Sequence, residues 1–181
     1  MFPMIAIVAE LRAAKALLAE ARDEVRRRGQ SVPERIETGI MVEIPAAALR
    51  AQQFAPEVDF FSIGTNDLTQ YTLAAERGNA RVAPLADAFQ PAVLQLIRLT
   101  ADAAHAHGKW VGVCGELAGD PLAVPLLIGL GVDELSMSAP AIPRAKQIIR
   151  ALDYAAVRAQ AQSALELETP EAVRAAFAAA K

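Results

Sequence analysis

The chain has 181 residues, of which 54% are hydrophobic and 22% charged, and its formal net charge at pH 7 is −3. This composition excludes a disordered chain and predicts a globular domain with one sizeable core. The weakly acidic balance gives no support to binding of nucleic acid or to insertion in a membrane, and no apolar run is long enough to span one. A lone cysteine excludes an internal disulfide, so we expect a cytoplasmic protein.

The predicted elements alternate between strands and helices along the chain. Residues 2–7 form a short apolar run that we expect to be a strand, and its abrupt start suggests a piece of a longer protein. Apolar residues at helical spacing from Leu11 to Val25 predict a helix that ends near Gly29. The later strands are expected at 39–44, 58–63, 110–114 and 133–137, with helices opening at Pro45 and spanning 68–75, 91–108, 121–130, 142–152, 154–167 and 170–180.

The five expected strands are mostly continuous apolar runs, as in a sheet that is covered on both faces. Their alternation with helices indicates an α/β fold with a parallel sheet, either open or closed into a barrel. The motif Gly-x-Gly-x-x-Gly does not follow the first strand, which weakens a dinucleotide-binding interpretation.

Polar or reactive side chains stand where the expected strands end. Glu43 lies at the end of one strand, Asn66 and Asp67 follow the next, and Cys114 ends the one after that. If the strands are parallel, these residues meet at one rim, where the chemistry of α/β folds takes place. Two carboxylates on neighbouring strands repel unless a cation lies between them, and two carboxylates with open positions suit Mg²⁺ or Mn²⁺.

Each of these residues also has a plain structural interpretation. Asn66 and Asp67 would suit the start of a helix, where short polar side chains accept from free backbone N–H groups. Arg77, ten residues after Asp67, is either a solvated loop arginine or a bidentate clamp for phosphate or carboxylate. A lone cysteine is more often a small buried side chain, although the glycine after Cys114 favours exposure in a site.

Three long motifs carry a specific resemblance. They are MVEIPAA at 41–47, DFFSIGTNDLTQYTL at 59–73 and GKWVGVCGELAGDP at 108–121. They closely resemble the C-terminal domain of Enzyme I, the phosphoenolpyruvate–protein phosphotransferase of the bacterial sugar phosphotransferase system, which related multiphosphoryl transfer proteins share. The resemblance runs from Met1 almost to the C-terminus, so we expect one partial domain over the chain and no second domain.

The resemblance implies a fold, ligands and roles for individual residues. The fold would be the second part of a TIM-type (β/α)8 barrel that binds phosphoenolpyruvate with Mg²⁺, releases pyruvate and forms a homodimer. Glu43 and Asp67 would be the metal ligands. Asn66 and Arg77, with Asp67, would contact the substrate. Cys114 would be the acid that protonates the enolate carbon, a role that suits a thiol because most thiols are protonated at neutral pH.

The whole protein implied by the resemblance would transfer a phosphoryl group to a histidine on a separate N-terminal domain and then to a small phosphocarrier protein, for sugar uptake. Neither His105 nor His107 lies in such an acceptor motif, so we expect the chain alone to be inactive. One alternative is the related barrel of pyruvate phosphate dikinase or phosphoenolpyruvate synthase, although residues 117–120 favour Enzyme I. The other is a non-catalytic fragment for dimerisation or ligand binding.

Overall fold

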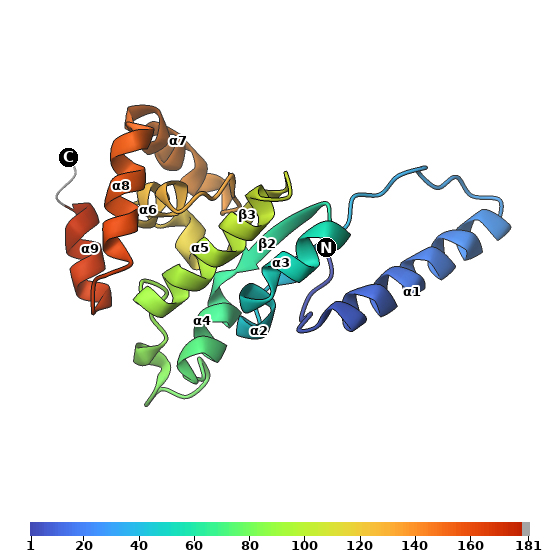
Figure 1. Ribbon diagram of the computed structural model, residues 1–181, viewed down its shortest axis with the longest axis horizontal. Coiled ribbons are helices and arrows are strands. Elements are labelled where there is room, and N and C mark those ends of the chain that lie inside the picture. The colour runs from blue at the N-terminus through green and yellow to red at the C-terminus, as the bar shows by residue number, and fades with distance from the viewer. Residues whose placement is uncertain (179–181) are drawn as a thin grey trace.

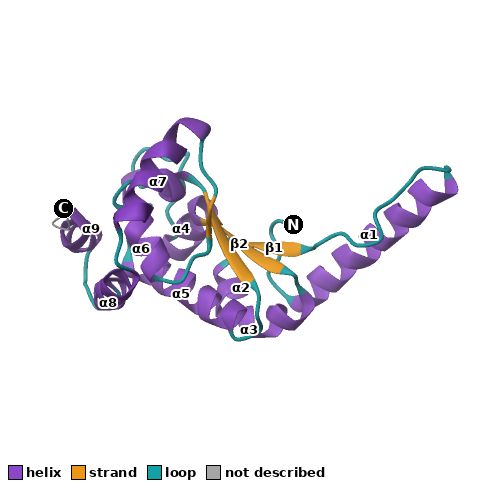
Figure 2. Ribbon diagram, turned by 90° about the horizontal axis from the view of Figure 1, so that it is seen from above, coloured by secondary structure: helices purple, strands orange, loops and turns teal. Residues whose placement is uncertain are grey.

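A parallel sheet lies at the centre of the chain, which the computed structural model describes over residues 1–178. Within these residues four strands pair in the order β1, β2, β3, β4, so each strand has as its neighbour the next strand of the chain. Figure 2 shows α2, α3 and α5 along one side of the strands. This is the winding of a (β/α) barrel, whereas a doubly wound sheet reverses its strand order. The strands are β1 (Gly39–Val42), β2 (Phe60–Gly64), β3 (Trp110–Cys114) and β4 (Glu134–Leu135).

The helices begin where the sequence offers a suitable residue. Pro45 and Pro91 are the first residues of their helices, where a missing backbone N–H has no intrahelical partner to lose. Asp153 caps another helix by accepting a hydrogen bond from the backbone N–H of Ala156 at 2.9 Å. The expected order of helices is confirmed, although residues 179 and 180 of the last one lie outside the described residues. The helices are α1 (Val8–Arg27), α2 (Pro45–Leu49), α3 (Ala51–Phe54), α4 (Thr65–Leu73), α5 (Pro91–His105), α6 (Ala123–Gly129), α7 (Ile142–Ala151), α8 (Tyr154–Ala164) and α9 (Pro170–Ala178).

The two faces of the sheet differ in composition and in cover. One face carries aliphatic and aromatic side chains that are completely buried in the core. The opposite face carries Ser62, which pairs with Gly112. Two residues earlier on the same strands, the rings of Phe60 and Trp110 stack with their centroids 4.5 Å apart. The second face is covered less completely than the first, since Ser62 is buried there but Trp110 is 37% exposed. The completely buried face consists of Ile40, Val42, Phe61, Ile63, Val111 and Val113.

The strand expected over residues 2–7 is wrong in extent. Phe2 alone in this stretch forms a parallel bridge, to Ile40, with its backbone N–H donating to Gly39 and its carbonyl accepting from Met41, both at 2.8 Å. The chain then leaves the sheet because Pro3 has no N–H to donate and Met4 has a positive φ of 55°. The described residues therefore contain four strands and one bridge where the sequence predicts five strands.

Helix α1 extends away from the rest of the molecule, as Figures 1 and 2 both show. Leu11, near its start, is buried, whereas Leu17 is 65% exposed. Its first turns are held by Arg12 and Lys15, which both hydrogen-bond to Glu57 in the short 3-10 helix before β2. None of the described helices is both long enough and apolar enough to cross a membrane.

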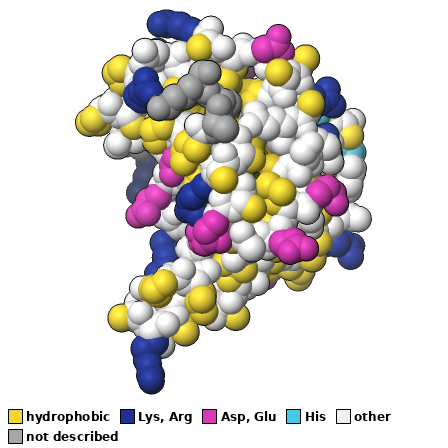
Figure 3. Space-filling view, turned by 90° about the vertical axis from the view of Figure 1, so that its left-hand side faces the viewer, with side chains coloured by type: hydrophobic (Ala, Val, Ile, Leu, Met, Phe, Trp, Pro, Cys, Tyr) yellow, Lys and Arg dark blue, Asp and Glu magenta, His cyan; other side chains and the backbone are white. Residues whose placement is uncertain are grey.

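The opposite end of the molecule is formed by α7, α8 and α9 (Figure 1). Figure 3 looks onto this end and shows acidic and basic side chains mixed among apolar ones. Among the described residues of this face, the acidic side chains interrupt the basic ones, so these residues form no continuous basic surface of the kind that nucleic acid requires.

Helices α6 and α8 approach each other so closely that one residue at their contact has to be glycine. A Cβ atom on Gly129 would lie 2.5 Å from the carbonyl oxygen of Val157 and 2.6 Å from the Cβ of Ala161. Both contacts involve atoms that are fixed to the backbone of α8, so relief requires the two helices to separate.

We expect Gly129→Ala to lower the free energy of unfolding by about 1–3 kcal/mol, the usual cost of overpacking a core. Urea unfolding followed by circular dichroism measures this. The matched control is Gly78→Ala, where the added Cβ would meet only the Glu76 carboxylate at 3.5 Å and stability should stay within about 0.5 kcal/mol of the parent. Equal midpoints for both variants would show that α6 and α8 are not in tight contact.

Candidate active site at the carboxyl ends of the strands

The carboxyl ends of β1, β2 and β3 bring the predicted residues to one rim of the sheet. Gly64 at the end of β2 pairs with Cys114 at the end of β3, and Glu43 comes directly after Val42, which pairs with Ile63. A Cβ atom on Gly64 would lie 3.2 Å from the Cβ of Glu43 and 3.3 Å from its Oε2. The glycine at position 64 therefore leaves the space that the Glu43 carboxylate occupies.

The Glu43 side chain is 4% exposed, which is unusual for a carboxylate. Its Oε1 accepts a hydrogen bond from the backbone N–H of Met4 at 2.7 Å. Met4, which has the positive φ noted above, is therefore in contact with the rim through its backbone. A buried carboxylate needs hydrogen bonds or a cation, and one backbone donor meets part of that need.

The side chains of Asn66 and Asp67 do not cap the helix that they were expected to open. Helix α4 starts three residues before the expected position 68, at Thr65, and Gly64 is its N-cap. The Asn66 side-chain carbonyl instead accepts from the backbone N–H of Glu116 at 3.3 Å. Thr65 donates to the carbonyl of Cys114 at 2.9 Å. The first turn of α4 therefore ties the end of β2 to the end of β3, and the capping interpretation is wrong.

Arg77 returns to the rim and forms an ion pair with Asp67. Its Nη2 lies 2.5 Å from the Asp67 Oδ1, and its Nε and backbone N–H both donate to the Gln70 Oε1 at 3.3 and 3.2 Å. The two charged side chains are 48% and 34% exposed, so solvent screens the pair. A pair of this kind can exchange its carboxylate for an anionic ligand at little cost.

The Cys114 thiol is partly exposed at the end of β3, as the following glycine suggested. Gly115 has a φ of 102°, and a Cβ atom there would lie 2.6 Å from the Thr65 Oγ1. The Ser62 hydroxyl lies 3.9 Å from the Cys114 sulfur. Ser62 was not among the predicted site residues, although a serine within an otherwise apolar strand was a signal.

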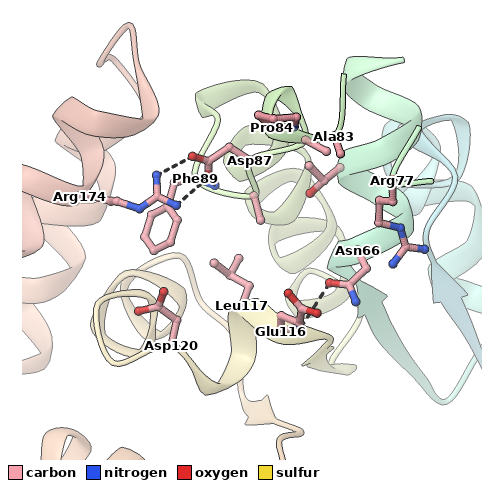
Figure 4. A pocket seen from close by; sticks show the side chains of 13 residues that line it. Asn66, Arg77, Ala83, Pro84, Asp87, Phe89, Glu116, Leu117, Asp120 and Arg174 are labelled. Atoms are coloured by element: carbon pink, nitrogen blue, oxygen red, sulfur yellow. Dashed lines mark hydrogen bonds and ion pairs between the residues drawn. The ribbon is translucent and has the colours of Figure 1, made fainter. Parts of the chain in front are cut away.

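A pocket of about 400 Å³ opens beside these strand ends (Figure 4). One side is formed by Asn66, Arg77 and Glu116, and the other by Asp87, Phe89 and Arg174. The second group was not predicted, because residues 87 and 174 are far apart in the chain and no motif joins them. Glu43, Asp67 and Cys114 are not among the pocket-lining residues, so they form the neighbouring part of the rim.

The carboxylates at the rim fit one kind of Mg²⁺ site, in which the protein supplies few of the ligands. No three His, Cys, Asp or Glu side chains within residues 1–178 come together to hold a metal ion by themselves. Glu43 and Asp67 supply hard oxygen donors, and the absence of a side chain at Gly64 leaves room for the Glu43 carboxylate. Such a pair leaves most positions of a Mg²⁺ ion to water and to substrate oxygens. The donor set fits an ion shared with an anionic substrate and does not fit a structural metal.

Comparison with known proteins gives consistent matches. Residues 1–154 match the family model described as PEP-utilising enzyme, PEP-binding domain, where PEP is phosphoenolpyruvate. Proteins named phosphoenolpyruvate-protein phosphotransferase are similar to the chain over 173 residues: 52% identical in Listeria monocytogenes serovar 1/2a, 54% in Geobacillus stearothermophilus and 53% in Bacillus subtilis strain 168. Each match covers 96% of the chain and 30% of the relative, so the chain spans less than a third of these proteins.

Proposed function

The chain belongs to the family of phosphoenolpyruvate-utilising enzymes, through their phosphoenolpyruvate-binding domain, and from this premise we propose that its rim binds phosphoenolpyruvate within a phosphoenolpyruvate–protein phosphotransferase. The observation that carries the proposal is the convergence of unlike groups at one rim. Two carboxylates, an arginine and a thiol come from the ends of three neighbouring parallel strands and the segments that follow them. Phosphoryl transfer from an enol phosphate needs all three kinds of group.

The phosphoryl group would be held by Arg77 and Asn66. When an anion arrives, Arg77 exchanges its exposed contact with Asp67 for phosphoryl oxygens, which its planar guanidinium can meet with two parallel hydrogen bonds. The Asn66 carbonyl is already turned to the Glu116 N–H, which leaves the NH₂ group to donate to the substrate.

Asp67, released from Arg77, and Glu43 would hold Mg²⁺. The ion, when bound, supplies positive charge to both the moving phosphoryl group and the enolate that remains.

The reaction breaks the bond between phosphorus and the enol oxygen, and the electron pair stays with the enolate. The phosphoryl group passes to an acceptor histidine, and the Cys114 thiol gives its proton to the enolate carbon, which yields pyruvate. His105 and His107 are poor candidates for the acceptor, because they lie near the end of α5, by the opposite ends of the strands. There His105 Nε2 lies 2.9 Å from the Asp133 carboxylate.

The acceptor would therefore come from outside this chain, whose relatives are more than three times as long. We extend the proposal to the whole protein: transfer onward to a phosphocarrier protein for sugar uptake, a homodimer, and a cytoplasmic location. These features rest on the resemblance and on the names of the relatives.

We expect Glu43→Gln to weaken Mg²⁺ binding in the presence of phosphoenolpyruvate by about 10- to 100-fold, because the amide keeps the shape but loses the charged ligand. Titration with Mn²⁺ followed by electron paramagnetic resonance, or with Mg²⁺ by calorimetry, measures this. The matched control is Glu20→Gln, which removes an exposed carboxylate from α1, outside the sheet, and should leave affinity unchanged. Equal losses in both variants would refute a specific role for Glu43.

We expect Cys114→Ala, placed in the complete enzyme, to slow pyruvate formation by about 10²- to 10⁴-fold while leaving the KM for phosphoenolpyruvate nearly unchanged. A proton donor acts in the chemical step and contributes little to binding the substrate. Steady-state assay of pyruvate gives both constants. An unaltered turnover number would remove Cys114 from the chemistry and leave it as a packing residue.

A further inference from the structure

Arg174, in the C-terminal helix α9, reaches across to the far wall of the pocket. Its Nη1 and Nη2 lie 2.5 and 2.9 Å from the two carboxylate oxygens of Asp87, which makes a bidentate ion pair. The guanidinium carbon lies 4.2 Å from the centre of the Phe89 ring. The Asp87 carboxylate also accepts from the backbone N–H of Phe89 at 2.9 Å. These three residues, which we call the clamp, are seen together in Figure 4.

Helix α9 packs firmly against the body of the molecule, so the backbone of Arg174 is held in place. Val173 and Phe177, on either side of it along the helix, are buried in the core. Gln160 of α8 donates to the carbonyl of Ala176 at 2.7 Å. Arg174 lies outside residues 1–154, the part of the chain that matches the family domain.

The segment that the clamp holds is the connection from α4 to α5, residues 74–90. Arg77 lies near its start, a 3-10 turn occupies Ala83–Leu85, and Asp87 and Phe89 lie near its end. Residues 76–81 are all exposed, and their backbone hydrogen bonds reach only a few residues along the chain. Such a segment opens easily unless a long-range contact restrains it. The ion pair with Arg174 is a long-range contact of this kind, 87 residues apart in sequence.

Charge keeps the clamp closed at neutral pH. Burial by itself would raise the pKa of Asp87, but the hydrogen bonds from Arg174 and from the Phe89 N–H lower that pKa below its ordinary value. The same pocket is also lined by Thr69, which is 2% exposed and whose hydroxyl has no hydrogen-bond partner within residues 1–178. A buried hydroxyl without a partner indicates that this space takes a polar ligand or water.

We infer that Arg174 is a positioning residue of the phosphoenolpyruvate site: through Asp87 and Phe89 it holds the 74–90 segment against the pocket and so fixes where Arg77 stands. The inference rests on the proposed function for the identity of the ligand. Arg174 touches none of the reacting groups at the rim. Loss of Arg174 therefore makes Arg77 more mobile and weakens substrate binding. The rate of the chemical step in bound substrate stays almost unchanged.

The chain contains its own probe of this segment, because trypsin cleaves after Arg77 and Arg81. In the chain without ligand, Arg174→Ala should speed cleavage at these two bonds about tenfold, since proteolysis follows the open population of the segment. The matched control is Arg98→Ala, which removes the ion pair of Arg98 with Asp102 on α5, at 2.7 Å. That variant should be cut at 77 and 81 at the rate of the parent. Mass spectrometry assigns and times each cut.

A second variant guards against a folding defect in the first. Asp87→Asn removes the charge from the other side of the clamp while leaving Arg174 on the Phe89 ring, and it should also speed cleavage at Arg77 and Arg81, by a smaller factor. In the complete enzyme, Arg174→Ala should raise the KM for phosphoenolpyruvate about tenfold with less than about a twofold change in kcat, and Arg174→Lys should restore part of the loss.

Cleavage at the parent rate in both Arg174→Ala and Asp87→Asn would overturn the inference, and so would a fall in kcat with an unchanged KM. The assay without ligand does not depend on what the site binds, so it separates the two proposals. The clamp variants could be cut faster while phosphoenolpyruvate with Mg²⁺ fails to slow cleavage of the parent. In that case the proposed function is wrong, but the inference that the clamp restrains the 74–90 segment still holds.

Discussion

The parallel register of β1, β2 and β3 is the constraint on which the rest of the site depends. Because Val42 pairs with Ile63, and Gly64 with Cys114, three strand ends are brought level at one rim. Two features hold these strand ends in place with room for their side chains. Glycines at 64 and 115 leave space for their neighbours, and the Thr65 hydroxyl donates a hydrogen bond that joins the end of β2 to the end of β3. A shift of register by one residue would turn Cys114 into the core and an apolar side chain into the rim.

Much of this arrangement could be predicted from the sequence, because the strands are short apolar runs and the residues at their ends break the pattern. Glu43 and Cys114 were found in this way, and both lie at the rim. The strand predicted at 2–7 was wrong because its apolar composition was given more weight than Pro3, a residue that cannot donate to a strand pair. The positive φ of Met4, by contrast, has no signal in the sequence. Local composition cannot foresee how a backbone turns to reach a distant carboxylate.

The remaining errors and omissions are long-range. Asn66 and Asp67 have the residue types of helix caps, and only the folded chain shows that they reach Glu116 and Arg77. Arg174 could not be found from spacing, since it meets Asp87 only after α8 and α9 pack against α6. Motifs describe groups that lie close in sequence, whereas the wall of this pocket is assembled from segments that tertiary packing brings together.

The central claim is that the rim formed by β1, β2 and β3 binds phosphoenolpyruvate together with Mg²⁺. Nuclear magnetic resonance of the isotope-labelled chain tests it most directly, by following backbone amides during titration with phosphoenolpyruvate at fixed Mg²⁺. The account predicts saturable shifts largest at residues 43, 64–67, 77 and 114–116, which disappear when Mg²⁺ is removed. Shifts centred on the apolar groove between β4 and α7, around Leu135 and Ile149, or shifts indifferent to Mg²⁺, would contradict it.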